Sequence, residues 1–181
     1  MELIYNTKRL SLQVLGPEDA DKVLAFYKRN KSHLEPWESK RHNNFYTYNY
    51  QRATLGFEYE LIVRRRSFRL WIILKNDPNN LIGTVNFYNI SKGKPSCCQV
   101  GYKIDSNYVK KGIAYEALEF SIRLVSREFS LQRIEAKIMP SNTPSIHLIE
   151  KLGFKYEKLL KSSAKINGKW EDHLLYSLNF E

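Results

Sequence analysis

The chain has 181 residues and a formal net charge of +10, with 43% hydrophobic and 27% charged residues. This length fits a single domain over residues 1–181 with a sizeable core, and the composition excludes a disordered chain. The positive charge favours polyanionic partners, such as a phosphorylated ligand or ribosomal RNA, without choosing between them.

The cysteines and the hydropathy pattern bear on the compartment. Cys97 and Cys98 are adjacent and too few for a disulfide framework, which favours a reducing environment. The N-terminal segment has no apolar stretch of signal-peptide length. No run approaches the roughly 20 apolar residues of a membrane span. We therefore expect a cytoplasmic protein with no membrane partner.

Hydrophobic periodicity predicts a strand, two helices and an antiparallel meander in the first part of the chain. Gly16-Pro17 opens the first helix, because proline is well suited to a first helical turn. The stretch 77–80, Asp-Pro-Asn-Asn, predicts a turn between two strands of the meander. The predicted elements are a strand at 9–15, a helix from 17, a helix at about 50–65, and strands at 68–74, 81–89 and 98–104.

The pattern then changes to a parallel crossover, in which strand 98–104 leads through a long helix into strand 133–139. We expect an α/β fold with a mixed, mostly antiparallel sheet of six to seven strands and helices on both faces. Ligands of such sheets favour places where strands part. The remaining elements are a helix at 113–128, a helix at 144–152, and strands at 154–160 and 170–178 joined by an Asn167-Gly168 turn.

A basic glycine loop opens the long helix. The first turn of a helix presents unpaired N–H groups and a positive dipole end. Gly112 allows a tight turn and a close approach to a ligand. Lys110 and Lys111 add charge at the same place. The loop therefore suits a pyrophosphate group, although solvated lysines in loops are common.

This loop resembles the acetyl-CoA loop of the GNAT acetyltransferase superfamily, whose pattern is Q/R-x-x-G-x-G/A. The glycine and the final alanine of the pattern are present, whereas Val109 replaces Gln or Arg and Lys110 replaces a frequent Gly. Residues 131–157 carry the R-I-E-A, N-x-x-S and K-x-G-F elements of the same superfamily. The segments TKRLSL, HLEPWES and WEDHLLYSL resemble the Rim-type branch, which acetylates the N-termini of ribosomal proteins.

The resemblance implies acetyl-CoA as co-substrate, no metal, and parallel strands 98–104 and 133–139 that splay apart around the pantetheine arm. It implies that Asn142 contacts this arm and that Ser145 can hydrogen-bond or protonate the departing sulfur. The stretch Ser141-Asn142-Thr143 before Pro144 also fits an ordinary helix cap. The expected acetyl-CoA contacts are Tyr102, Lys103, Ile104, Val109, Lys110, Lys111, Gly112, Ile113, Ala114, Tyr115, Asn142 and Ser145.

The general base is less well defined by the sequence. Some Rim-type enzymes have a glutamate three positions before the Asn-Gly turn, where this chain has Ala164. Glu135 is the candidate base, and a structural ion pair is its alternative role. Glu38 is a further candidate, whereas His147 and His173 are expected to be structural.

A weak base suits an α-amine, whose pKa of about 7.7–8 lies well below the value near 10.4 of lysine. We therefore expect a protein N-terminus as acceptor, with ribosome proximity and a monomer or homodimer as further expectations. A non-catalytic acyl-CoA-binding regulatory domain and a small-molecule acetyltransferase stay open. An RNA-binding module is disfavoured, because the run 64–66 lies at a helix end and no RNA-recognition motif is present.

Overall fold

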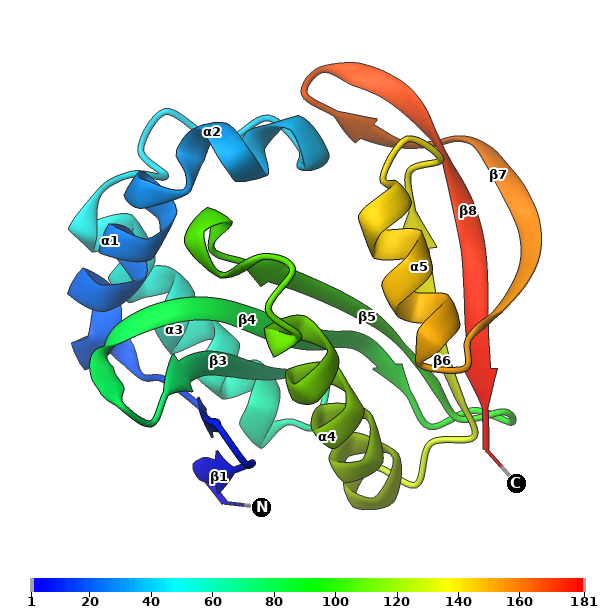
Figure 1. The fold of residues 1–181 in the computed structure, drawn as a ribbon, viewed down its shortest axis with the longest axis horizontal. Helices are drawn as coiled ribbons and strands as arrows, with labels where there is room; N and C mark the ends of the chain where they lie inside the picture. The colour runs from blue at the N-terminus through cyan, green and yellow to red at the C-terminus, as the bar shows by residue number, and fades with distance from the viewer. Residues whose placement is uncertain (1, 181) are drawn as a thin grey trace.

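A computed structural model of the chain describes residues 2–180. Within this range eight strands form one sheet in the order β1-β2-β3-β4-β5-β6-β8-β7, in which β5–β6 is the parallel pair (Figure 1). The elements are β1 (Ile4–Asn6), β2 (Leu10–Gln13), η1 (Pro17–Asp19), α1 (Ala20–Arg29), α2 (Lys31–Leu34), η2 (Glu35–Trp37), α3 (Tyr48–Val63), β3 (Phe68–Leu74), β4 (Asp77–Ser91), β5 (Cys97–Ile104), η3 (Ser106–Tyr108), α4 (Ile113–Glu128), β6 (Arg133–Ile138), α5 (Thr143–Lys151), β7 (Lys155–Ile166) and β8 (Lys169–Asn179).

The sheet separates two hydrophobic cores, because successive side chains of a strand point to opposite faces. In β3, Leu70 and Ile72 pack into the core that also contains buried residues of α4 and α5. Trp71 and Ile73 pack into the other core, with residues of α1 and α3. Figure 1 shows α4 and α5 in front of the sheet and α3 behind it. The helices therefore cover both faces, as the sequence predicts.

The strand count and one turn differ from the sequence prediction. The sheet has eight strands rather than six to seven, because the segment Ile4–Asn6 also pairs with β2. The turn predicted at 77–80 is wrong, since Asp77 already pairs with Leu74 and the turn is Lys75-Asn76. Two register shifts between β3 and β4 accommodate the Asp-Pro-Asn-Asn stretch inside the hairpin, where such residues mark irregularities.

Strands β5 and β6 part after a short paired region. Cys97 pairs with Arg133, and the last parallel pair joins Gln99 to Glu135. Beyond this point β5 continues along β4 as far as Ile104, while β6 continues along β8. Figure 1 shows the two strands diverging from their paired ends. The predicted splay of the two parallel strands is thus confirmed.

Candidate functional site

The loop after β5 begins at a buried aspartate. The Asp105 carboxylate accepts hydrogen bonds from Arg29 Nε at 2.7 Å, Asn30 Nδ2 at 2.9 Å and the Asn107 amide at 2.9 Å. Burial alone would raise the pKa of Asp105, but these hydrogen bonds outweigh it and lower the pKa. Since Arg29 and Asn30 end α1, the loop starts from a point fixed by a distant helix.

The loop then turns into α4 with a left-handed residue at the helix N-cap. Gly112 has φ 73° and Lys110 has φ 58°. The Glu116 amide donates to the Gly112 carbonyl, which closes the first helical turn. The amides of Ile113, Ala114 and Tyr115 precede this bond and have no intrahelical acceptor. The geometry therefore presents three main-chain donors and a positive helix end, as an anion site requires.

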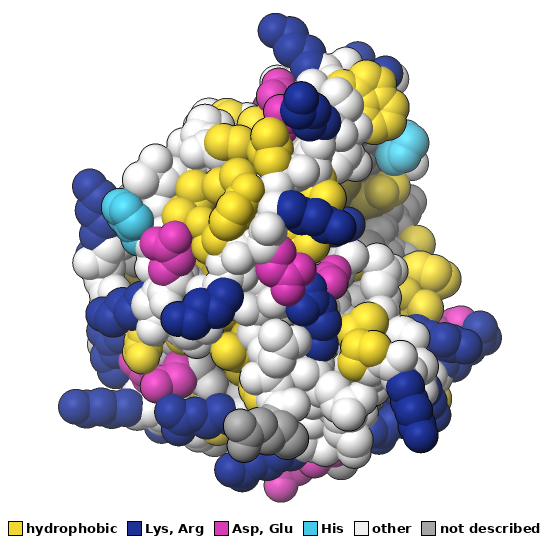
Figure 2. Space-filling model, turned by 90° about the vertical axis from the view of Figure 1, so that its right-hand side faces the viewer, with side chains coloured by type: hydrophobic (Ala, Val, Ile, Leu, Met, Phe, Trp, Pro, Cys, Tyr) yellow, Lys and Arg dark blue, Asp and Glu magenta, His cyan; other side chains and the backbone are white. Residues whose placement is uncertain are grey.

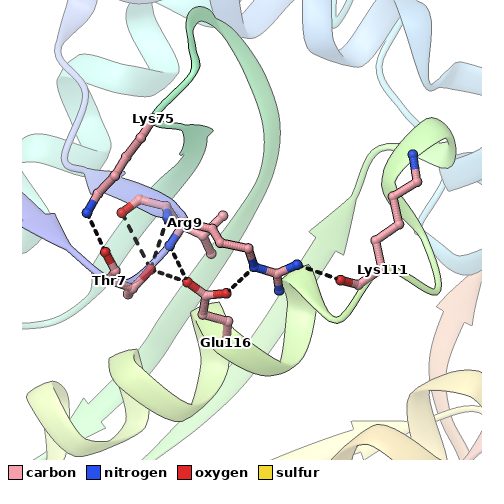
Figure 3. A network of polar contacts seen from close by, with 6 residues as sticks. Thr7, Arg9, Lys75, Lys111 and Glu116 are labelled. Carbon is pink, nitrogen blue, oxygen red and sulfur yellow. Dashed lines mark hydrogen bonds and ion pairs between the residues drawn. The ribbon is translucent and has the colours of Figure 1, made fainter.

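Residues of the turn between β1 and β2 hold this loop from one side (Figure 3). Arg9 Nε donates to Glu116 Oε2 at 2.6 Å, and Arg9 Nη1 donates to the Lys111 carbonyl at 2.9 Å. Thr7 Oγ1 and the Arg9 amide donate to Glu116 Oε1 at 2.6 and 2.8 Å, and Lys75 contacts the Thr7 carbonyl. Burial alone would raise the pKa of Glu116, but these hydrogen bonds outweigh it and lower the pKa. The sequence gives no sign of this network, because its hydrogen bonds join residues that are 68 to 109 positions apart in the chain.

Tyr102 and Ser145 meet across the split between the strands. Tyr102 Oη lies 2.5 Å from Ser145 Oγ, and Asn142 Oδ1 accepts from the Ser145 amide at 3.3 Å. Asn142 therefore caps α5, as one of its two expected roles requires. Burial raises the pKa of Tyr102 to about 12, although the Ser145 hydrogen bond lowers it. The phenol is thus protonated at neutral pH and can supply a proton to Ser145.

Lys103 and Ile104 point to opposite faces of β5. Ile104 is buried in the core with α4, whereas the Lys103 ammonium lies on the other face, 2.5 Å from Glu38 Oε1. Arg41 pairs with the second oxygen of Glu38. Burial lowers the pKa of Lys103. Glu38 therefore lies beside the split but is held between two cations.

Glu135 has an ion-pair partner. Arg133 Nε lies 3.0 Å from Glu135 Oε1, and the same guanidinium donates two hydrogen bonds of 2.7 Å to Glu157. This arrangement fits the structural alternative, and a role of Glu135 as base stays a prediction. Ala164 of β7 lies opposite Glu171 of β8 in the antiparallel pair. An acid that the sequence pattern did not indicate therefore lies on the strand next to the expected position of the base.

The β7–β8 hairpin reaches the segment that contains Glu38. Its turn has left-handed backbone at Asn167, with φ 46°, and at Gly168, with φ 88°, so the predicted Asn-Gly turn is confirmed. The Asn167 amide donates to the Glu38 carbonyl at 3.0 Å. In Figure 1 the tip of this hairpin lies close to the end of the α2 segment. His173 is buried in β8 and His147 is exposed on α5.

Residues 2–180 contain no helix that is both long and apolar enough to cross a membrane. The surface charge is spread widely. Figure 2 shows lysine and arginine side chains distributed over one whole face, with hydrophobic side chains exposed between them. The exposed apolar residues include Tyr156 and Trp170 of the β7–β8 hairpin. This face offers no single basic patch of the kind that would mark a nucleic-acid site.

Comparison with known proteins finds the acetyltransferase (GNAT) domain over residues 9–155. The chain is 33% identical over 172 residues to the [ribosomal protein uS5]-alanine N-acetyltransferase of Escherichia coli, covering 95% of this chain and 88% of the relative. It is 31% identical to the probable N-acetyltransferase YjcK of Bacillus subtilis, covering 94% of each chain.

Solved structures show the same similarity. The ribosomal-protein-S5-alanine acetyltransferase of Vibrio fischeri superposes with a TM-score of 0.92 at 32% identity, covering 98% of this chain and 97% of the other. RimJ of Mycobacterium smegmatis, in complex with CoA-disulfide, gives a TM-score of 0.87 at 26% identity, covering 94% and 81%. The similarity therefore extends over nearly the whole chain.

Proposed function

Since the chain belongs to the GNAT acetyltransferase family, it is an N-acetyltransferase, and we propose that its acceptor is the α-amino group of a protein N-terminus. A ribosomal protein is the first candidate, because relatives that are 32–33% identical are named for acetylating a ribosomal-protein alanine. We also propose that the protein acts in the cytoplasm near ribosomes.

The observation that carries the proposal is the split between β5 and β6 with a helix N-terminus at its side. The strands part after the pair Gln99 and Glu135, so the main chain of 102–104 is not paired with β6. This main chain would bind the pantetheine arm, while the amides that begin α4 would bind the pyrophosphate. The proposed acetyl-CoA contacts remain those expected from the sequence: residues 102–104, 109–115, Asn142 and Ser145.

The proposed chemistry is direct transfer. A neutral α-amine attacks the thioester carbonyl, the new C–N bond forms, and the C–S bond then breaks. A main-chain amide of β5 would stabilise the developing oxyanion. The Ser145 hydroxyl would protonate the leaving thiolate and recover its proton from Tyr102, whose oxygen lies 2.5 Å away. Water would accept the proton that the amine loses on attack, and solvent would return a proton to Tyr102. No strong base is needed, because an α-amine with a pKa of about 7.7–8 has an appreciable neutral fraction at neutral pH.

The first test is a set of substitutions at this pair. We expect Ser145→Ala to lower kcat by about 100-fold, the lower part of the range for loss of a general acid. We expect Tyr102→Phe to lower kcat less, because the serine hydroxyl remains. Both variants should keep a KM for acetyl-CoA within about twofold, since the main-chain contacts are unchanged. Ser126→Ala, in the last turn of α4 and away from its N-terminus, is the matched control and should keep full activity.

The acceptor is tested by mass spectrometry of peptides that carry both a free N-terminus and an internal lysine. Acetylation of the α-amine alone supports the proposal. Acetylation of the lysine, or of small amines in preference to peptides, would contradict it. Acetyl-CoA binding without transfer to any amine would instead favour the regulatory-domain alternative.

A further inference from the structure

A small cavity lies on the face of the sheet opposite α4 and α5. It has a volume of about 140 Å³ and lies between α1, α3 and the strands β3 and β5. Pockets for drug-sized ligands have about 300–1,000 Å³, so this cavity is too small for a coenzyme and suits a single side chain. The lining residues that matter here are Tyr27, Arg41, Glu58, Arg69, Trp71 and Lys103.

The cavity carries more positive than negative charge. Three lining side chains are cations, namely Arg41, Arg69 and Lys103. Arg69 pairs with Glu58 at 2.9 Å, while Lys103 and Arg41 share the single carboxylate of Glu38. Two carboxylates thus balance three cations, and one positive charge is left over in a partly buried space.

Two arginines that line the cavity each have a guanidinium nitrogen without a hydrogen-bond partner among the described residues. Within residues 2–180, Arg41 Nε and Arg69 Nε are both shielded from solvent and donate to nothing. Buried polar groups in folded proteins nearly always have a partner, so two unused donors of one charge sign in one cavity need an explanation. An anion in the cavity would supply the acceptor that each of them lacks.

Tyr27, which lines the cavity, is affected by the same positive charges. Burial alone would raise the pKa of Tyr27, but the charges of Lys103 and Arg69, with a smaller contribution from Arg41, outweigh burial and lower it. The phenol has a ring within 5.3 Å of the Lys103 ammonium and of the Arg41 guanidinium carbon. The cations around Tyr27 therefore favour a negative charge at this position in the cavity wall.

We propose that this cavity is a subsite that binds a carboxylate of the acceptor, an assignment that rests on the proposed transfer to a peptide. Lys103 connects the cavity with the proposed acetyl-CoA site, because its main chain lies at the split between β5 and β6 and its side chain lines the cavity. A carboxylate presents a planar pair of oxygens that matches guanidinium donors. An aspartate or glutamate close to the acceptor N-terminus would therefore bind here while the amine reaches the thioester.

The first test does not depend on turnover. Trp71 lines the cavity, and replacement of the other two tryptophans by phenylalanine leaves its fluorescence as a local probe. Titration with glutarate at constant ionic strength should give a saturable change, and neutral glutaramide should not. Arg41→Gln and Arg69→Gln should each weaken the glutarate response by about tenfold or more, as expected for a hydrogen bond to a charged group.

Arg64→Gln is the matched control, because Arg64 is an exposed arginine at the end of α3 and, among residues 2–180, pairs only with Glu60. It removes the same charge and should leave the response unchanged. If Arg69→Gln fails to fold because Glu58 loses its partner, Arg41→Gln alone decides the question. The absence of a saturable change, an equal response to glutaramide, or full retention in Arg41→Gln would overturn the proposal.

The second test uses acceptor peptides with Glu or Gln at positions two, three or four. We expect kcat/KM to be about tenfold higher for the best Glu peptide than for its Gln partner, and Arg41→Gln should remove this preference. Equal kcat/KM for every pair would overturn the assignment to the acceptor. If no peptide is acetylated at all, the proposed function fails, and the glutarate titration still decides whether the cavity binds a carboxylate.

Discussion

At the scale of single residues, the loop before α4 depends on a glycine in a left-handed conformation. Gly112 has φ 73°, and a Cβ built there would lie 3.4 Å from Arg9 Nη2. Gly168 in the β7–β8 turn has φ 88° and nothing within 4 Å of the same position. The two glycines share a left-handed conformation, but only Gly112 lies in the proposed acetyl-CoA loop. Substituting each of them therefore distinguishes the effect of backbone strain from the effect on ligand binding.

We predict that Gly112→Ala weakens acetyl-CoA binding by about tenfold or more, because the added Cβ shifts the amides that form the proposed cradle. Both Gly112→Ala and Gly168→Ala should lower the free energy of unfolding by about 1–2 kcal/mol, the value for a left-handed non-glycine residue. Isothermal titration with acetyl-CoA and urea unfolding measure the two effects. Unchanged acetyl-CoA affinity in Gly112→Ala would refute the cradle.

Residues whose role is local were predictable from the sequence, and residues whose role depends on distant partners were not. Gly112 and the Asn167-Gly168 turn are signalled by their own neighbours, because backbone conformation is a short-range property. Arg69 and Lys103 gave no such signal. Their environment arises only when β3 and β5 enter the same sheet, with α3 covering it.

At the scale of secondary-structure elements, the turn between β1 and β2 is connected to α4 by the contacts of Arg9 with Glu116. We predict that Arg9→Met raises the Kd for acetyl-CoA by about three- to tenfold, because the Lys111 carbonyl and Glu116 both lose a donor. Arg123→Met is the control, since Arg123 is exposed on the same helix and pairs with Glu119. Calorimetric titration of both variants gives the comparison, and equal Kd values would show that these contacts of Arg9 do not position the loop.

Strands β6, β7 and β8 are joined by the Glu157 carboxylate. Hydrogen bonds from Arg133 and Ser177 lower the pKa of Glu157 to about 2. The carboxylate is bound more tightly in its charged form, so its contribution to stability is present above pH 4.5 and lost as the pH falls towards 2. The site is partly exposed, so screening limits this contribution to about 1 kcal/mol or less.

We predict that Glu157→Gln lowers the free energy of unfolding at pH 7 and that this difference shrinks below pH 4.5, vanishing near pH 2. Urea unfolding at a series of pH values measures it. Glu60→Gln, which removes an exposed carboxylate from α3, should show no difference at any pH. A Glu157→Gln effect that is independent of pH would mean that packing, rather than charge, is responsible.

At the scale of the whole molecule, the net charge of +10 should draw polyphosphates towards the protein. We predict that the KM for acetyl-CoA rises about three- to tenfold between 50 and 500 mM KCl, because salt screens this attraction. Acetyl-pantetheine lacks the phosphates and should show little salt dependence. The same salt dependence for both donors would assign the effect to the acceptor or to the enzyme itself.

The overall architecture was largely predictable, because the order of strands and helices and the parallel crossover follow from hydrophobic periodicity. The strand at Ile4–Asn6 was too short to show a period, and the 77–80 stretch was misassigned because turn-forming residues also mark bulges. The residue that acts as general base could not be predicted from the sequence, because this role depends on which acidic side chain lies near the split between β5 and β6 once the sheet has formed.

The bond between the Asn167 amide and the Glu38 carbonyl has a geometric consequence. Glu38 is also tied to Lys103 of β5, and Asn167 belongs to the hairpin that continues into β8, the neighbour of β6. Strands β5 and β6, which separate after Gln99 and Glu135, are thus linked again at their far ends through Glu38 and Asn167. These contacts close a ring around the split. If the acceptor enters through this ring of contacts, a free N-terminus would enter more readily than an internal stretch of chain, which would have to enter as a loop.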